Sequence, residues 1–193
     1  MIERLAIFGA TGDLTARYLL PGLAALQAAG QLGDRFQLAS AGREKWDTER
    51  FRQWAAAQLD RHGGQFPAAA RQAVVSASSY HQADVADVPS VADVIAGDGP
   101  VAAYLALPPA VFPVAVSTLH DAGLPPGSKI VLEKPFGEDL DSAVELNRLL
   151  AETLPEPAVL SGRPDRRPPG PRLRGRGRRQ SPARHRDLRR NGT

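Results

Sequence analysis

Two glycines near the start of this 193-residue sequence have the spacing of a phosphate-binding turn. Gly9 and Gly12 follow an apolar run that ends at Phe8 and precede a helical pattern. Glycine adopts backbone angles closed to other residues and lets a ligand approach the main chain closely. The start of a helix adds unpaired N–H groups and a partial positive charge, which together suit a pyrophosphate. The alternative is a turn without a ligand, because the spacing is G-x-x-G and Thr15 stands where a third glycine could be.

A second candidate phosphate ligand is Arg43, which follows Gly42 at the end of the next expected strand. In sites that prefer NAD, an acidic residue near this point bonds the ribose 2′-hydroxyl. A guanidinium can instead pair with a 2′-phosphate through two hydrogen bonds, which favours NADP. The alternative is a solvated arginine whose charge is partly neutralised by the neighbouring Glu44.

Two further groups follow apolar strands expected later in the chain. Pro108 and Pro109 end a strand over residues 101–107, and Lys134 follows a strand over residues 129–132. Ligands of open α/β sheets bind at the carboxyl ends of such strands. A lysine there can donate to a sugar oxygen or a phosphate, although an exposed loop lysine would look the same in isolation.

Strand and helix patterns alternate along the chain, which predicts an α/β fold with a doubly wound, Rossmann-like parallel sheet. Strands are expected up to Phe8 and over residues 36–42, 101–107 and 129–132. Helices are expected from Leu14 to Leu26 and over residues 48–59, 68–75, 91–96, 111–122 and 140–154.

Three blocks of this sequence resemble the glucose-6-phosphate dehydrogenase family. They are Gly9-Ala-Thr-Gly-Asp-Leu-Thr-Ala-Arg17, Tyr104-Leu-Ala-Leu-Pro-Pro109 and Glu133-Lys-Pro-Phe-Gly137. The resemblance covers about residues 1–159 and implies NADP as cofactor. It implies glucose 6-phosphate as the substrate of the full family enzyme, which yields 6-phosphogluconolactone and NADPH in the pentose phosphate pathway. Homo-oligomers are also typical of the family.

The resemblance assigns roles to eleven residues. Gly9, Thr11, Gly12, Asp13 and Leu14 would approach the pyrophosphate, Arg43 the 2′-phosphate, Asp84 and Val85 the adenine, and Leu107, Pro108 and Lys134 the nicotinamide side, with Lys134 also touching the substrate. Asp84 and Val85 would follow a strand that begins near Tyr80. The catalytic histidine of the family belongs to a second domain that this sequence does not match. No catalytic residue is therefore assigned, and we expect the chain alone to be inactive.

The charge changes abruptly near residue 160. Residues 1–160 hold 12 basic and 19 acidic residues, whereas residues 161–193 hold 12 arginines and two aspartates, a net charge of +10. The second segment has too few apolar residues to fold. We therefore expect a nucleotide-binding domain over residues 1–159, whose sheet lacks its last strand, and a disordered tail over residues 160–193. Such a tail is also what a shifted reading frame in a GC-rich gene would encode.

Two other classes of protein share parts of this pattern. Short-chain dehydrogenases and epimerases also carry Gly-x-x-Gly, but they need a Tyr-x-x-x-Lys pair, and no tyrosine here has a lysine four residues later. A nucleic-acid-binding protein could use the arginines of the tail, but no aromatic residue lies among them to stack on bases, and we do not expect a nucleic-acid partner.

The composition bounds the location and the kind of site. The sequence contains no cysteine, which fits a reducing compartment and excludes thiolate metal ligands. No apolar run reaches the ~18 residues of a membrane span. The N-terminus lacks the pattern of a signal peptide. We therefore expect a cytoplasmic protein without a membrane partner or a metal site.

Overall fold

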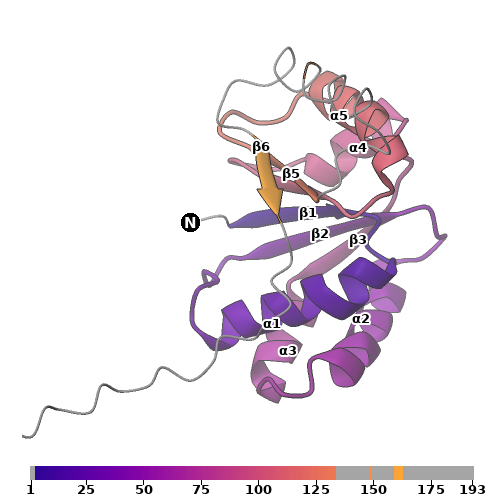
Figure 1. Ribbon diagram of the computed structural model, residues 1–193. Helices are drawn as coiled ribbons and strands as arrows, with labels where there is room; N and C mark the ends of the chain where they lie inside the picture. The colour runs from indigo at the N-terminus through magenta and orange to yellow at the C-terminus, as the bar shows by residue number, and fades with distance from the viewer. Residues whose placement is uncertain (1–2, 134–147, 149–158, 163–193) are drawn as a thin grey trace, which may run out of the picture.

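A six-stranded parallel sheet forms the centre of the protein (Figure 1). The computed structural model describes residues 3–133, 148 and 159–162. The strands are β1 (Arg4–Phe8), β2 (Gln37–Gly42), β3 (Ser78–Gln82), β4 (Ala102–Leu105), β5 (Lys129–Glu133) and β6 (Val159–Gly162). Their spatial order is β3-β2-β1-β4-β5-β6, which is the doubly wound order of a Rossmann fold. The α/β class predicted from the sequence is confirmed.

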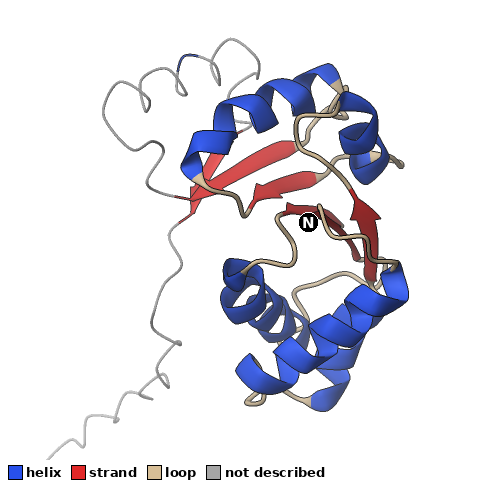
Figure 2. Cartoon of the chain, turned by 90° about the vertical axis from the view of Figure 1, so that its right-hand side faces the viewer, coloured by secondary structure: helices blue, strands red, loops and turns tan. Residues whose placement is uncertain are grey.

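Helices cover both faces of this sheet (Figure 2). They are α1 (Leu20–Ala28), α2 (Thr48–His62), α3 (Ala68–Ser76), α4 (Val88–Ile95) and α5 (Phe112–Asp121), with short turns of helix η1 (Thr15–Leu19) and η2 (Pro109–Val111) before α1 and α5. On the face of α1, α2 and α3, Ile7 of β1 packs with Leu20 and Phe51. On the face of α4 and α5, Phe8 packs with Phe112. Successive residues of β1 thus point to opposite faces of the sheet and belong to two separate hydrophobic cores.

The first helix widens to a π-helical turn over η1. The N–H of Leu20 donates to the carbonyl of Thr15, five residues earlier instead of four. Pro21 follows at once, and proline lacks an N–H and crowds the carbonyl four residues before it. The wider turn accommodates this proline inside a helix that continues to Ala28. The periodicity of leucines predicted the helix but not its widening.

Capping side chains decide where α2 and α4 begin. Asp47 accepts a hydrogen bond from the N–H of Arg50 at 2.7 Å, and Asp87 accepts one from Ser90 at 3.0 Å. Such caps satisfy N–H groups that the first helical turn leaves unpaired. The helix α4 therefore begins at Val88, three residues before the expected start at residue 91, where the apolar pattern begins.

Two strands differ from the sequence-based expectation. The strand β3 covers Ser78–Gln82 and ends before Asp84 and Val85, which lie in the loop that follows. The strand β6 crosses the domain boundary expected after residue 159. It pairs in parallel with β5, with Val159 opposite Ile130, and occupies the place of the strand that was expected to be missing.

Several expectations fall on residues outside the described part. These are Lys134, the tail over residues 163–193 and all of the helix expected over residues 140–154 except Arg148, which is helical and exposed. Within the described residues, no helix has the length and apolar character needed to cross a membrane.

Candidate functional site

A cavity of about 460 Å³ opens at the carboxyl edge of the sheet, where β1 is flanked by β2 and β4. The strand order reverses at this point, which is where doubly wound sheets bind ligands. Eight of the eleven residues predicted to bind a cofactor line the cavity. They are Gly9, Thr11, Gly12, Arg43, Asp84, Val85, Leu107 and Pro108. The fold thus brings together residues from four separate segments of the chain.

The turn after β1 requires glycine at position 9. Its φ is +83°, and a Cβ built there would lie 2.3 Å from the carbonyl oxygen of Ala106. The N–H groups of Gly9 and Ala10 both donate to the carbonyl of Ala41, at 3.0 and 2.9 Å. These two hydrogen bonds hold the turn against the end of β2, where Gly9 lines the cavity without a side chain.

Thr15 closes the turn where a third glycine was considered. Its side chain is fully buried, and its hydroxyl donates to the carbonyl of Gly9 at 3.3 Å. The N–H of Gly12 donates to the same carbonyl at 3.1 Å. This carbonyl therefore accepts two hydrogen bonds, which join the turn to the start of the helix without a third glycine.

Asp13 and Leu14 do not line the cavity. They belong to the first turn of the helix, and the carboxylate of Asp13 is exposed and paired with Arg17 at 3.4 Å. Their remaining route to a ligand is through the backbone, because the first N–H groups of a helix have no partner within it. Contact between these two residues and a pyrophosphate stays a prediction.

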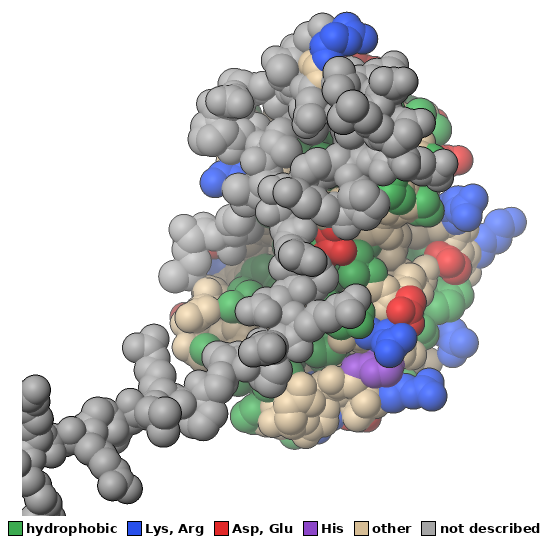
Figure 3. Space-filling model, viewed as in Figure 1, with side chains coloured by type: hydrophobic (Ala, Val, Ile, Leu, Met, Phe, Trp, Pro, Cys, Tyr) green, Lys and Arg blue, Asp and Glu red, His purple; other side chains and the backbone are tan. Residues whose placement is uncertain are grey.

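The loop after β2 places opposite charges at the rim of the cavity. Arg43 is exposed and has no hydrogen-bond or ion-pair partner within residues 3–133, 148 and 159–162. The next residue, Glu44, also lines the cavity. In Figure 3, basic and acidic side chains lie close together on the right-hand side of the molecule. The strands β1 and β2 run toward this side in Figure 1. The rim can therefore attract a phosphate through one residue and repel it through the next.

Tyr80 joins this loop to the core and was not singled out as a site residue by the sequence. Its hydroxyl lies 3.0 Å from the carbonyl oxygen of Glu44 and 3.2 Å from the carboxylate oxygen Oε2. Burial, reinforced by the charge of Glu44, raises the pKa of Tyr80 well above its ordinary value, so the hydroxyl keeps its proton. Its ring stacks on Phe51 with centroids 5.3 Å apart. Only its inward position on β3 could have indicated this role.

The loop after β3 supplies a wall of the cavity. Val85 packs against the core beneath α4 and α5 together with Leu107. Asp84 accepts a hydrogen bond from the N–H of Ala86 at 3.0 Å, and its carbonyl accepts one from the hydroxyl of Ser90 at 3.0 Å. These bonds hold the loop against the start of α4. The wall thus combines the partly buried Val85 with the exposed polar group of Asp84.

The strand β5 ends at the residue before Lys134. Its last residue, Glu133, accepts a hydrogen bond from the hydroxyl of Tyr104 on β4. Burial and the bond to Glu133 raise the pKa of Tyr104, so this hydroxyl also stays protonated. The bond ties β5 to β4 at the edge from which the predicted substrate lysine follows.

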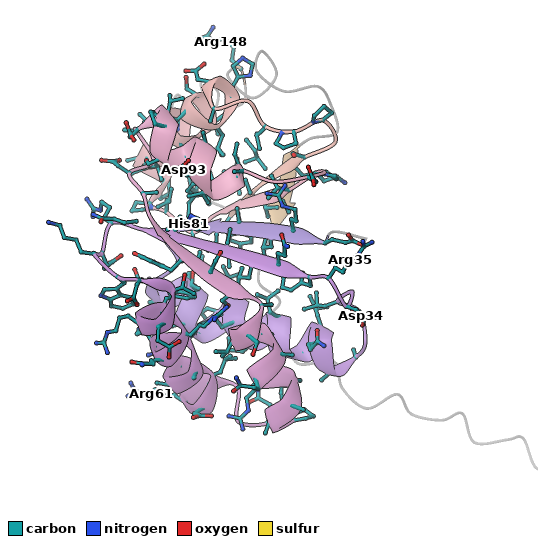
Figure 4. All side chains as sticks on the ribbon, turned by 180° about the vertical axis from the view of Figure 1, so that it is seen from behind. Asp34, Arg35, Arg61, His81, Asp93 and Arg148 are labelled. Atoms are coloured by element: carbon teal, nitrogen blue, oxygen red, sulfur yellow. The ribbon has the colours of Figure 1, made fainter. Side chains whose placement is uncertain are left out.

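The histidines of the described residues, His62, His81 and His120, do not line this cavity. His81 lies on β3 below α4, which carries Asp93 (Figure 4). Burial lowers the pKa of His81, and the charge of Asp93 partly opposes that shift. Among the described residues, no group of three or more metal-ligating side chains occurs.

Comparisons with known proteins point to one family. The model of the family described as "Glucose-6-phosphate dehydrogenase, NAD binding domain" matches residues 6–161. Glucose-6-phosphate 1-dehydrogenase of Zymomonas mobilis is 33% identical over 165 residues, which cover 82% of this chain and 34% of that protein. The enzyme of Bacillus subtilis is 32% identical, over 80% of this chain and 34% of its own length. The chain thus spans about a third of the length of these relatives.

Solved structures of the same enzyme share this fold. The crystal structure of glucose-6-phosphate 1-dehydrogenase from Mycobacterium avium superposes with a TM-score of 0.76 at 29% identity, covering 83% of this chain and 35% of that chain. A glucose-6-phosphate dehydrogenase in complex with its substrate glucose 6-phosphate gives a TM-score of 0.73 at 27% identity, covering 82% and 36%.

Proposed function

Because the chain belongs to the glucose-6-phosphate dehydrogenase family, with its NAD binding domain over residues 6–161, we propose that its cavity binds NADP. The observation that carries the proposal is the turn at Gly9. There the backbone leaves no room for a Cβ and meets the start of a helix at the point where the strand order reverses. This is the arrangement that admits a pyrophosphate in a doubly wound sheet.

The residues around the cavity fit the parts of NADP. Gly9, Thr11 and Gly12, with the first N–H groups of the helix, would hold the pyrophosphate. Arg43 would pair with the 2′-phosphate, which supports NADP over NAD. The loop of Asp84 and Val85 would flank the adenine, and Leu107, Pro108 and Lys134 would face the nicotinamide, with Lys134 also reaching the substrate.

When bound, the cofactor supplies the nicotinamide ring that accepts a hydride from the sugar. The proposal extends to the complete family enzyme, with glucose 6-phosphate oxidised at C1 to 6-phosphogluconolactone, homo-oligomerisation and a cytoplasmic location. The role of the present residues is to bind and orient the dinucleotide. Within the described residues, no histidine lines the cavity, and we assign no base for the sugar hydroxyl to them.

Titration of the purified 193-residue chain with NADP and with NAD by isothermal calorimetry tests this proposal. We expect NADP to bind more tightly than NAD. The substitution Arg43→Ala removes a charged partner of the 2′-phosphate and should weaken NADP binding about 10- to 100-fold, because charge-assisted hydrogen bonds contribute ~1.5–3 kcal/mol. Binding of NAD should change by less than about threefold, since NAD lacks that phosphate.

The matched control is Arg35→Ala. Arg35 is exposed, lies at the opposite end of β2 and contacts Glu3 at a distance of 4.0 Å. Its loss should leave both affinities unchanged. Failure of the wild-type chain to bind either nucleotide would contradict the proposed function. Equal losses of NADP and NAD binding in Arg43→Ala would contradict the assignment of the 2′-phosphate to this arginine.

A further inference from the structure

We propose that Glu44, held in place by Tyr80, limits the preference of this site for NADP over NAD. The inference rests on the proposed function and names a second determinant at the same rim. The carboxylate would accept a hydrogen bond from the 2′-hydroxyl of NAD and would repel the 2′-phosphate of NADP. The neighbouring Arg43 favours the phosphate, so the two residues act in opposite directions on the same ribose position.

The position of the Glu44 carboxylate supports this role. A Cβ built on Gly42 would lie 2.6 Å from Oε2 of Glu44, 2.8 Å from the hydroxyl oxygen of Tyr80 and 3.6 Å from the hydroxyl of Thr11. These three polar groups therefore converge above the last residue of β2. In NAD-preferring sites an acidic side chain near the end of this strand binds the ribose.

Tyr80 restricts the movement of Glu44. Its hydroxyl lies within hydrogen-bond distance of both the carbonyl oxygen and the carboxylate of Glu44, and the same carbonyl accepts a hydrogen bond from the N–H of Trp46 at 2.8 Å. Phe51 and Trp46 surround the tyrosine ring, with centroids 5.3 and 6.1 Å away. An exposed glutamate without such contacts would sample many rotamers and lose more entropy on binding. Tyr80 is therefore a positioning residue for the loop.

The decisive substitution is Glu44→Gln, which keeps the shape of the side chain and removes its charge. Binding of NADP, NAD, 2′,5′-ADP and 5′-AMP to the full chain is measured by calorimetry. We expect the ratio of the NAD to the NADP dissociation constant to rise about three- to tenfold, since an exposed charge changes affinity modestly. The ratio of the 5′-AMP to the 2′,5′-ADP dissociation constant should rise by the same factor. That result would locate the effect at the adenosine end of the nucleotide.

Ionic strength separates repulsion from hydrogen bonding. The gain in NADP affinity caused by Glu44→Gln should be smaller at about 500 mM salt than at about 50 mM salt, because salt screens exposed charges. The loss in NAD affinity should depend less on salt. Tyr80→Phe removes the hydroxyl and keeps the ring, and should shift the ratio in the same direction by a smaller factor. Its melting temperature is measured in parallel, and the double variant with Glu44→Gln should show no additional shift in the ratio.

The matched control is Glu49→Gln. Glu49 is an exposed glutamate in the first turn of α2 and does not line the cavity, so its loss should leave the ratio unchanged. An unchanged ratio in Glu44→Gln, or a shift equal to that of Glu49→Gln, would overturn the inference. The proposed function would survive that result if wild-type NADP binding still depended on Arg43. Absence of binding to all four probes would overturn both.

Discussion

Gly9 has a positive φ and also lacks space for a side chain, so two separate costs apply to its replacement. Gly9→Ala should destabilise the domain by about 2–5 kcal/mol, combining left-handed backbone strain with a clash against Ala106. Gly30→Ala is the control, because Gly30 has a φ of +66° but a Cβ built there would have no atom within 4 Å. It should cost only about 1–2 kcal/mol. Urea unfolding measures both, and equal losses would mean that the close approach to Ala106 has no energetic effect.

At the level of single residues, the sequence predicted the groups that depend on local context. Gly9 and Arg43 follow strands that can be predicted from the apolar residues just before them in the sequence. The contact between Glu44 and Tyr80 could not be predicted in this way, because 36 residues separate the two and the strand pairing brings them together. Residues that act through a distant partner need the fold before they can be recognised.

The packing of α4 over β3 makes the contribution of His81 on β3 to folding stability depend on pH. Burial lowers the pKa of His81 below its usual value of 6.5, so the unfolded chain binds the proton more readily than the folded one. The contribution of His81 to stability is complete above pH 6.5 and declines as pH falls through that value. Urea unfolding at pH 7.5 and 5.5 should therefore show a larger loss of stability for the wild type than for His81→Gln. Equal losses would contradict the prediction.

Most elements were predicted because apolar residues mark their buried faces, and the differences have separate causes. The early start of α4 depends on a capping aspartate and a proline rather than on apolar spacing. The widened turn of η1 depends on Pro21. The strand β6 was overlooked because Val159 and Leu160 are the only apolar residues in it and polar sequence follows. Its backbone pairing with β5 is a tertiary contact that no local pattern encodes.

At the scale of the molecule, the chain combines a full doubly wound order of strands with a third of the length of its relatives. We expect it to bind the nucleotide but not to reduce NADP in the presence of glucose 6-phosphate. Absorbance at the wavelength specific for NADPH measures this, with a full-length enzyme of the family as positive control. Sustained formation of NADPH by the chain alone would contradict the prediction and would require a base within these 193 residues.

The central place of β1 has a mechanical consequence. Within the described residues, strands β2 and β3 are joined to the other half of the sheet only through β1, whose opposite side pairs with β4. The cavity is lined from both halves, by Gly42 and Arg43 on one side and by Leu107 and Val111 on the other. A dinucleotide bound there would contact both halves and would connect them in addition to the pairing of β1 with β4. Separation of the halves would then require release of the ligand, so occupancy would make the two halves open as one cooperative unit.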